Sequence, residues 1–300
     1  MADLGLISNA LDCGISDAQG LGLAHCKFNW NDMAGGSTLF LRRGTELPAA
    51  FTLASLRALQ VAGKLKVASN PFSVEIQNSD AQKETSSGGQ TAVATKGLYG
   101  FMNKYVNGLM FDTALASLNG QNGYDVVLVD SSGSFLYHTS KSGKRTGFSA
   151  GMVNATMIDF ASGATTTKTG VEFQLVNRSQ MDNGKTFVNA DELDFSILEL
   201  NGVNQLEVTL VAPANAATVI TGKIVSKFDS TLTSVEITQT ALTVTGATAS
   251  AATVGADGAL SITVGALTTG DIITVKVTGV FEDTEGVLFK SNTATVVTIA

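Results

Sequence analysis

Hydrophobic and polar residues alternate with a period of two along the last third of the chain. In residues 271–282, Ile273, Val275 and Val277 fall on one side of an extended chain, and mostly polar residues fall on the other. This alternation indicates strands with one buried face. The same pattern predicts strands at residues 204–212, 218–226, 234–239, 241–246, 259–265, 271–282 and 293–300. About seven short strands in ~100 residues, with a turn after roughly every 8–12 residues, predict a β-sandwich.

Residues 1–200 combine strand and helix patterns. Leu53, Leu56 and Leu59 have helical spacing and predict a helix over residues 52–65, capped by Thr52 or the residues just before it. Alternating β-branched and aromatic residues predict strands at residues 37–44, 72–79, 124–129, 135–139, 146–160, 170–178 and 193–200.

A second helix is expected over residues 98–111, where apolar residues form one stripe. The stripe consists of Leu98, Phe101, Met102, Tyr105, Val106 and Leu109, with Asn103, Lys104 and Asn107 opposite. The polar residues 79–95 before this helix predict a long loop, and loops of that length are uncommon in compact domains unless they bind something. We therefore expect a sheet-dominated fold with one principal helix, between strands in residues 72–95 and 124–139.

The composition changes abruptly near residues 201–204. Beyond this point Cys, His, Met, Trp, Tyr and Arg no longer occur. Such a shift predicts two domains, residues 1–200 and 201–300. A hydrophobic content of 44%, with 31 glycines and only 3 prolines, is typical of a folded chain with many short strands and tight turns.

The charge of the chain argues against several partners. A net charge of -7 and a pI of 4.8 do not suit nonspecific nucleic-acid binding, which needs a basic face. The first residues carry acids where a secretory signal has cations, and no stretch approaches the ~20 apolar residues that span a bilayer. We expect neither classical export nor a membrane partner.

The residue types needed for catalysis are scarce. His25 and His138 are the only histidines, and the Ser132 and Ser134 near His138 have the spacing of an ordinary hairpin turn. Nucleophilic hydrolysis needs a nucleophile, a base and an orienting group, and no G-x-S-x-G elbow is present. We expect no enzyme activity and no catalytic residue.

Metal and cofactor sites are not expected either. Cys13 and Cys26 with His25 do not provide the spacing of a zinc site, so we expect ordinary thiols, with a disulfide open if the fold brings the two cysteines together. The glycine-rich residues 33–38 and 86–91 lack a P-loop lysine.

Two domain-level resemblances emerge from these patterns. The order and spacing of the strands after residue 204 resemble bacterial and phage immunoglobulin-like domains, although the Cys and Trp of antibody domains are absent. The earlier region is similar to tail-tube proteins of tailed bacteriophages. That similarity rests on the strand and long loop "FSVEIQNSDAQKETSSGGQTAV", the helix expected at 98–111 and the strands in "YDVVLVDSSGSFLYHT".

The resemblance implies an N-terminal domain of two packed antiparallel sheets, whose long loop reaches a neighbouring subunit, and a C-terminal immunoglobulin-like sandwich displayed outside. It implies a virion structural protein, assembled in the host cytoplasm, whose rings stack into a tail tube. Its partners would be copies of itself, other virion proteins and DNA passing through the lumen without specific binding. The alternatives are a capsid-decorating, head-fibre or baseplate protein with the same appendage, and a carbohydrate-binding adhesive module.

Self-assembly would also explain three cations on one short loop of an acidic chain. Lys141, Lys144 and Arg145 are expected to contact an acidic edge of a neighbouring copy. Candidates for that edge are Asp191, Glu192 and Asp194. The alternative is that these loop cations are simply solvated. The clustered acids are otherwise interpreted as a solvated approach to the domain boundary rather than as a glycosidase pair, which needs two carboxylates across a cleft.

Overall fold

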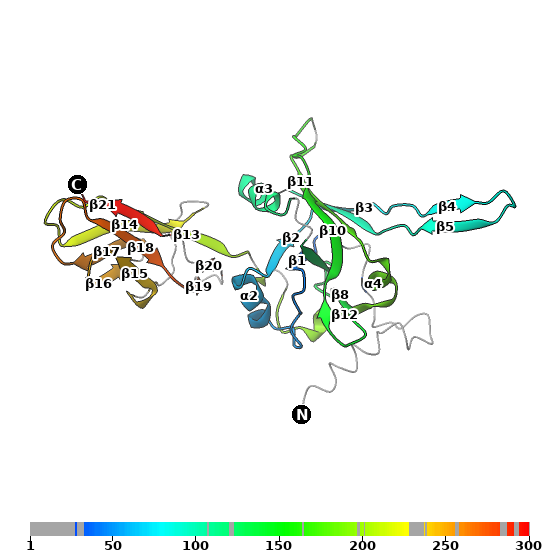
Figure 1. Ribbon diagram of the computed structural model, residues 1–300, viewed down its shortest axis with the longest axis horizontal. Helices are drawn as coiled ribbons and strands as arrows, with labels where there is room; N and C mark the ends of the chain where they lie inside the picture. Colours follow the sequence, from blue (N-terminus) through cyan, green and yellow to red (C-terminus); the bar gives the residue numbers. More distant parts are fainter. Residues whose placement is uncertain are drawn as a thin grey trace, which may run out of the picture. The chain divides into compact units, whose positions relative to one another are not determined.

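The computed structural model describes residues 28, 33–106, 108–119, 123–163, 165–196, 199–200, 202–227, 237, 239–255, 258–282, 287–290 and 294–299. The chain divides into two compact units, Met1–Leu200 and Asn201–Ala300, which are described separately below. Both units consist mainly of β-strands (Figure 1), which confirms the mainly β fold predicted from the sequence.

The first unit contains, in chain order, β1 (Ser37–Arg42), α2 (Leu53–Val61), β2 (Leu65–Ser69), β3 (Ser73–Ile76), β4 (Gln82–Thr85), β5 (Thr91–Thr95), β6 (Gly100–Tyr105), α3 (Leu109–Ala116), β7 (Tyr124–Val129), β8 (Phe135–Thr139), β9 (Arg145–Thr146), β10 (Phe148–Ala155), β11 (Thr169–Leu175), α4 (Arg178–Asn183), β12 (Lys185–Val188) and the 3-10 helix η2 (Ala190–Glu192).

Strand β10 connects the two halves of the antiparallel sheet in this unit. The strand order is β12-β8-β7-β10-β11-β6-β3, and β1 pairs with both β7 and β2. The beginning of β10 pairs with β7 through Phe148 and Ser149, whereas its later residues pair with β11. A register shift between Ala150 and Met152 lies within the pairing with β11, directly after the residues that pair with β7. A bulge of this kind bends a strand, so β10 can take part in two packed layers.

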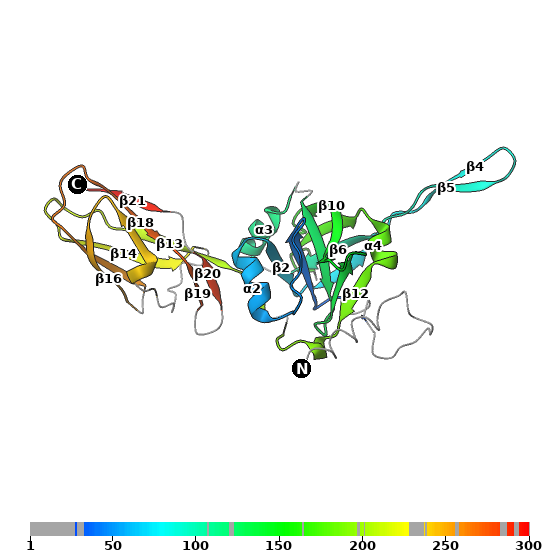
Figure 2. The same cartoon turned by 60° about the horizontal axis from the view of Figure 1, so that its bottom comes forward.

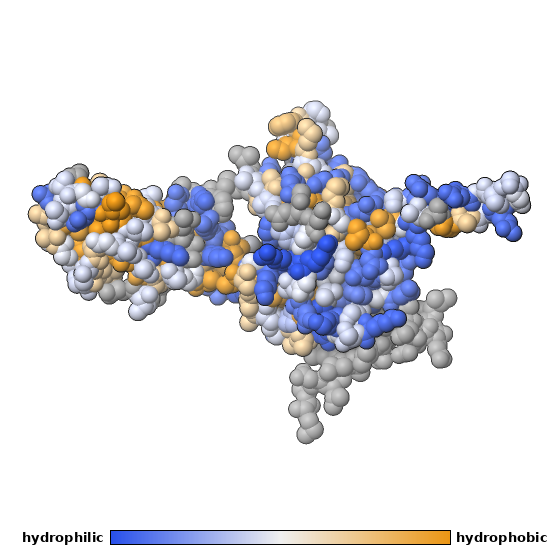
Figure 3. Space-filling model, viewed as in Figure 1, coloured by the Kyte–Doolittle hydropathy of each residue, from blue (hydrophilic) through white to orange (hydrophobic). Residues whose placement is uncertain are grey.

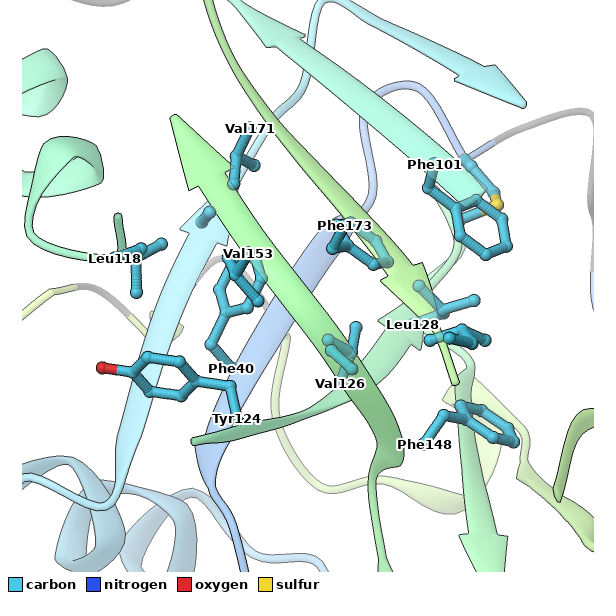
Figure 4. Packing of buried hydrophobic residues seen from close by; sticks show 14 of the residues in the cluster. Phe40, Phe101, Leu118, Tyr124, Val126, Leu128, Phe148, Val153, Val171 and Phe173 are labelled. Carbon is cyan, nitrogen blue, oxygen red and sulfur yellow. The ribbon is translucent and has the colours of Figure 1, made fainter. Parts of the chain in front are cut away.

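Strands β1 and β7 are buried on both faces. Phe40 and Val126 belong to a cluster that also includes residues of β6, β10 and β11, and Phe40 meets Phe173 edge-on at 5.9 Å between ring centroids (Figure 4). On the opposite face, Leu39 and Val127 pack in a second cluster with Leu56 of α2. This double burial explains why residues 124–129 form an apolar run without alternation.

The helix expected over residues 52–65 is confirmed as α2, although it ends at Val61. Thr52 caps its start: the Ser55 N–H donates to Thr52 Oγ1 at 3.2 Å, and the Thr52 N–H donates to Ser55 Oγ at 3.1 Å. This reciprocal capping box satisfies two backbone donors that the first turn leaves without helical partners. Leu56 is fully buried under the helix.

The helix expected over residues 98–111 is wrong. Residues 100–105 form strand β6, and the helix in this region, α3, begins only at Leu109. Phe101, Asn103 and Tyr105 all point inward with a period of two. Asn103, assigned from the sequence to a polar face, is 1% exposed and donates to Thr38 Oγ1 at 2.7 Å. Pairing with β3 on one side and β11 on the other outweighed the helical spacing.

The strand expected over residues 193–200 is also wrong. Its described residues, 193–196 and 199–200, contain no strand. Leu193, Phe195 and Leu200 instead pack against the second cluster beside β1 and β7. Their apolar spacing reflects contact with a core rather than pairing in a sheet. The described part of this unit contains three α-helices, and α3 lies between the strands of residues 72–95 and 124–139.

The second unit contains β13 (Asn204–Leu210), β14 (Val219–Ser226), the 3-10 helix η4 (Gln239–Ala241), β15 (Leu242–Thr245), β16 (Ala249–Val254), β17 (Ala259–Val264), β18 (Ile272–Val277), β19 (Val280–Glu282), β20 (Leu288–Lys290) and β21 (Thr295–Thr298). They form one sheet in the order β16-β17-β14-β13-β20-β19 and another in the order β15-β18-β21.

One hydrophobic core lies between these two sheets. Ile220 of β14 and Ile262 of β17 share a cluster with Ile273, Val275 and Val277 of β18, and all five are fully buried. The alternation predicted for β18 is therefore confirmed. Strands β16 and β20 were not predicted, residues 271–282 form two strands, and the strand expected at 234–239 lies largely outside the described residues.

Candidate functional site

A β-hairpin formed by β4 and β5 projects from the first unit, as Figures 1 and 2 both show. We call residues 77–100 the arm. From Gln82 to Lys96, every residue whose burial is described is exposed. The region predicted as a loop is therefore a hairpin, held across its strands by contacts such as that between the hydroxyls of Thr85 and Thr91, 3.2 Å apart.

The arm continues the pairing of β3 with β6. Those two strands pair as far as Ile76 and Phe101, and the Ser79 N–H then donates to the Leu98 carbonyl at 2.9 Å, before β4 and β5 begin. The main chain is thus hydrogen-bonded from the sheet into the arm. This continuity carries a narrow two-stranded ribbon away from the body of the unit.

Two glycines allow the chains to approach closely at the root of the arm. A Cβ atom at Gly97 would overlap the carbonyl oxygen of Ser79, and one at Gly100 would overlap that of Gln77. Gly97 is buried although it lies next to an exposed hairpin. Any side chain at either position would force the two chains of the root apart.

Helix α4 contacts the root through a charged cluster. The Tyr99 hydroxyl donates to Asp182 Oδ1 at 2.7 Å, and Arg178 Nε donates to Asp182 Oδ2 at 2.9 Å. The Arg178 guanidinium lies 5.7 Å from the centre of the Tyr99 ring, and its Nη1 donates to the Gly97 carbonyl at 3.4 Å. We call Tyr99, Arg178 and Asp182 the root cluster.

The cluster shifts the ionisation of its members in consistent directions. Hydrogen bonds from Tyr99 and Arg178 hold the pKa of Asp182 below its usual value, and the hydrogen bond to Asp182 raises the pKa of Tyr99. Near neutral pH the charged carboxylate and the neutral phenol are therefore both favoured, which is the combination that the contact requires.

The predicted cationic loop is tied to its own chain. Lys144 Nζ lies 2.6 Å from Glu46 Oε1, and Arg145 Nη1 donates to the Ala49 carbonyl. Hydrogen bonding to Glu46 raises the pKa of Lys144. Lys141 is exposed, and the structure shows it no ion-pair partner among the described residues. Of the three predicted contact residues, Lys141 is thus the one whose charge has no described partner within the chain.

The predicted acidic edge lies at and just after η2. Asp191 and Asp194 are exposed, and Glu192 is half-buried and accepts from Asn189 Nδ2 at 3.4 Å. Among the described residues, no ion pair joins these acids to the cationic loop. A contact between two copies remains a prediction.

No known protein-family model and no curated protein matches this sequence.

Of the residues considered for catalysis, Ser132, Ser134 and His138 are described, and all three make hydrogen bonds within the first unit. Asp130, fully buried, accepts from the backbone N–H groups of Ser132 and Ser134 at 3.0 and 2.9 Å, so the turn between β7 and β8 is built around its carboxylate. His138 is half-buried on β8 with Nδ1 2.9 Å from the Gly184 carbonyl. His25, Cys13 and Cys26 lie outside the described residues.

Two further features are absent from the described part of the chain. None of its helices is long and apolar enough to cross a membrane. Its His, Cys, Asp and Glu residues form no group of three or more that could hold a metal ion.

A second hairpin extension carries exposed apolar side chains. Met157 and Phe160 lie between β10 and β11 and are 89% and 79% exposed. Figure 3 shows hydrophobic surface at this extension. Lys104 of β6 lies 3.7 Å from Asp159 of the extension and 3.2 Å from Glu75 of β3. The base of this extension and the strand leading into the arm are therefore connected by one lysine.

The sequence pattern does not predict the root cluster. Tyr99 lies within the helix expected at residues 98–111, and Arg178 lies at the end of the strand expected at residues 170–178. The spacing of Arg178 and Asp182 is the only local signal, because residues four apart face each other on a helix. Their contact with Tyr99 joins positions about 80 residues apart, and no local pattern reports that.

Proposed function

We propose that the protein is a self-assembling virion structural protein whose rings stack into the tail tube of a tailed bacteriophage. The observation that supports this function best is the arm. A two-stranded hairpin by itself is marginally stable in water and gains stability by packing against a further surface. Its exposed strand edges also offer unpaired backbone groups to another chain.

The body of the first unit supports the same proposal. Its antiparallel layers enclose two hydrophobic clusters that would keep the arm on a rigid base. An arm on a rigid body can reach an adjacent copy, and repetition of the same contact builds a ring or a stack. In this proposal, DNA passes through the lumen without specific binding, and the second unit is carried as an appendage.

Electron microscopy of the purified chain tests the proposal. Negative-stain images over a range of protein concentrations and salts are expected to show rings and stacked tubes. Symmetric shells decorated by the protein, or trimers without stacking, would instead support a decoration role. A protein that stays monomeric under all these conditions in analytical ultracentrifugation would contradict the proposal.

A further inference from the structure

The root cluster holds the arm to a helix that is itself fixed to the core. Met181 of α4 is 3% exposed and belongs to the hydrophobic cluster beneath β10 and β11. The neighbouring Gln180 accepts from the Ser149 N–H of β10 at 2.9 Å through its Oε1. Helix α4 is therefore attached to the sheet at two successive residues, and one turn of it presents Arg178 and Asp182 to the root.

The two charged side chains of α4 contact the segment of the arm that leads from β5 into β6. One contact is with a side chain of that segment and the other is with its backbone. Asp182 accepts from the Tyr99 phenol at 2.7 Å, whereas Arg178 contacts the Gly97 carbonyl at 3.4 Å. Two attachment points along one strand restrict rotation of that strand about its own axis. Asp182, which bonds to Arg178 as well as Tyr99, connects the two attachments.

We propose that Tyr99, Arg178 and Asp182 are positioning residues that fix the direction in which the arm leaves the sheet, so that the arm of the free subunit is already aligned for a second copy. This inference rests on the proposed function, because it assumes that the arm binds a copy of the chain. It adds that assembly depends on a contact within one subunit, remote from the arm's tip.

The physical advantage is preorganisation. A two-stranded arm without lateral support samples many directions, and binding must then select the competent one. If loss of the cluster leaves the arm correctly directed about one-tenth of the time, the apparent affinity between subunits falls about tenfold. The cluster should therefore affect the concentration at which subunits assemble more than it affects the stability of the hydrophobic core.

The variants Tyr99→Phe, Asp182→Ala and Asp182→Asn separate the contributions to the cluster. Tyr99→Phe removes only the donated hydrogen bond. Asp182→Ala removes both hydrogen bonds, whereas Asp182→Asn retains an acceptor without the charge. Tyr124→Phe provides a matched control, because it removes a phenol hydroxyl from β7 in the same unit. A variant with residues 82–95 replaced by a short turn tests whether the arm itself is needed.

The experiment measures the critical concentration for assembly by light scattering and the hydrogen exchange of root amides in the full-length monomer. We expect Asp182→Ala to raise the critical concentration about tenfold, Tyr99→Phe and Asp182→Asn to raise it less, and Tyr124→Phe to leave it unchanged. The Ser79 amide should exchange faster in the first three variants, while the Tm of the core changes little.

The outcomes distinguish this inference from the function on which it rests. If the shortened-arm variant fails to assemble but Tyr99→Phe and Asp182→Ala assemble at the wild-type concentration, the positioning role is overturned and the assembly role of the arm stands. If the shortened-arm variant assembles normally, the arm is not the contact between copies. The assembly role of the arm and the positioning role of the root cluster are then both contradicted. If the wild-type chain itself never assembles, the proposed function is contradicted before any variant is compared.

Discussion

Lys144 and Glu46 form an ion pair within the chain, with Lys144 Nζ 2.6 Å from Glu46 Oε1. Both side chains are largely exposed, at 63% and 53%. Exposed pairs contribute little to stability because water and salt screen them. The pair therefore joins the loop between β8 and β9 to Glu46 and should contribute little to the stability of the unit.

Exchanging these two charges separates loop geometry from contact between copies. Lys144→Glu alone should weaken assembly, both because it repels Glu46 and because it removes a cation from the loop. The double variant Lys144→Glu with Glu46→Lys restores the pair within the chain, so recovery of assembly in light scattering would show that the loop's position matters. Continued failure would show that a cation at position 144 itself meets the neighbouring copy. Normal assembly by Lys144→Glu would remove the loop from the interface.

Lys141 provides a separate test of the predicted contact with the acidic edge. Lys141→Glu should raise the critical concentration for assembly, and the companion variant Asp191→Lys with Asp194→Lys should do the same. Combining all three substitutions should partly restore assembly if the two surfaces meet, because opposite charges then face each other again. Additive losses in the combined variant would show that these residues do not face each other.

Phe40 and Phe160 offer a matched comparison of burial. Phe40→Ala removes a fully buried ring from the cluster around β1 and should lower the free energy of unfolding by ~3–5 kcal/mol. Phe160→Ala removes a ring that is 79% exposed and should leave the free energy of unfolding nearly unchanged. Chemical denaturation followed by near-UV circular dichroism measures both values. Equal losses of unfolding free energy in the two variants would show that the Phe160 ring packs against other residues of the protein.

The root cluster predicts a pH window for order in the arm. The folded-state pKa of Asp182 is lowered, so its contribution is present above its ordinary pKa of 3.8 and is lost as pH falls through the lower folded value. The folded-state pKa of Tyr99 is raised, so its contribution is present below its ordinary pKa of 10.0 and is lost as pH rises through the higher folded value.

The order of the arm should therefore differ most between wild type and Tyr99→Phe at pH values between the folded-state pKa of Asp182 and that of Tyr99. In strong acid the two proteins should show the same arm order. Backbone carbon chemical shifts of residues around Gly97, measured by NMR, would follow the effect. Hydrogen exchange is unsuitable here, because amide exchange rates change too much across so wide a pH range. A difference that persists unchanged below the folded pKa of Asp182 would assign the stabilisation to something other than its carboxylate.

The second unit should fold without the first. Its hydrophobic cluster consists of residues from Leu206 to Ile299, so its core is contained within that range. A fragment of residues 202–300 should unfold cooperatively, with dispersed NMR signals. A chain without residues 202–300 should still assemble through the first unit, and electron microscopy would check this. A molten fragment would show that its core depends on the rest of the chain.

Elements whose local pattern is compatible with a single structure can be predicted from the sequence. Period-two alternation predicted β13, β14, β17 and β18, because a strand between core and solvent must alternate. Thr52 and the leucines after it predicted α2, because capping and helical spacing both act within a few residues. The change in composition near residue 201 likewise needs no knowledge of distant contacts.

Where a local pattern is compatible with two structures, contacts between distant residues select one of them. Residues 100–105 fit a helical stripe and a strand equally well, and pairing with β3 and β11 selected the strand. The same pairing, continued past Ile76, made a hairpin arm of a segment that looks like a loop. The contact of Tyr99 with Asp182 depends on bringing together residues remote in sequence, and local propensity carries no information about such pairings.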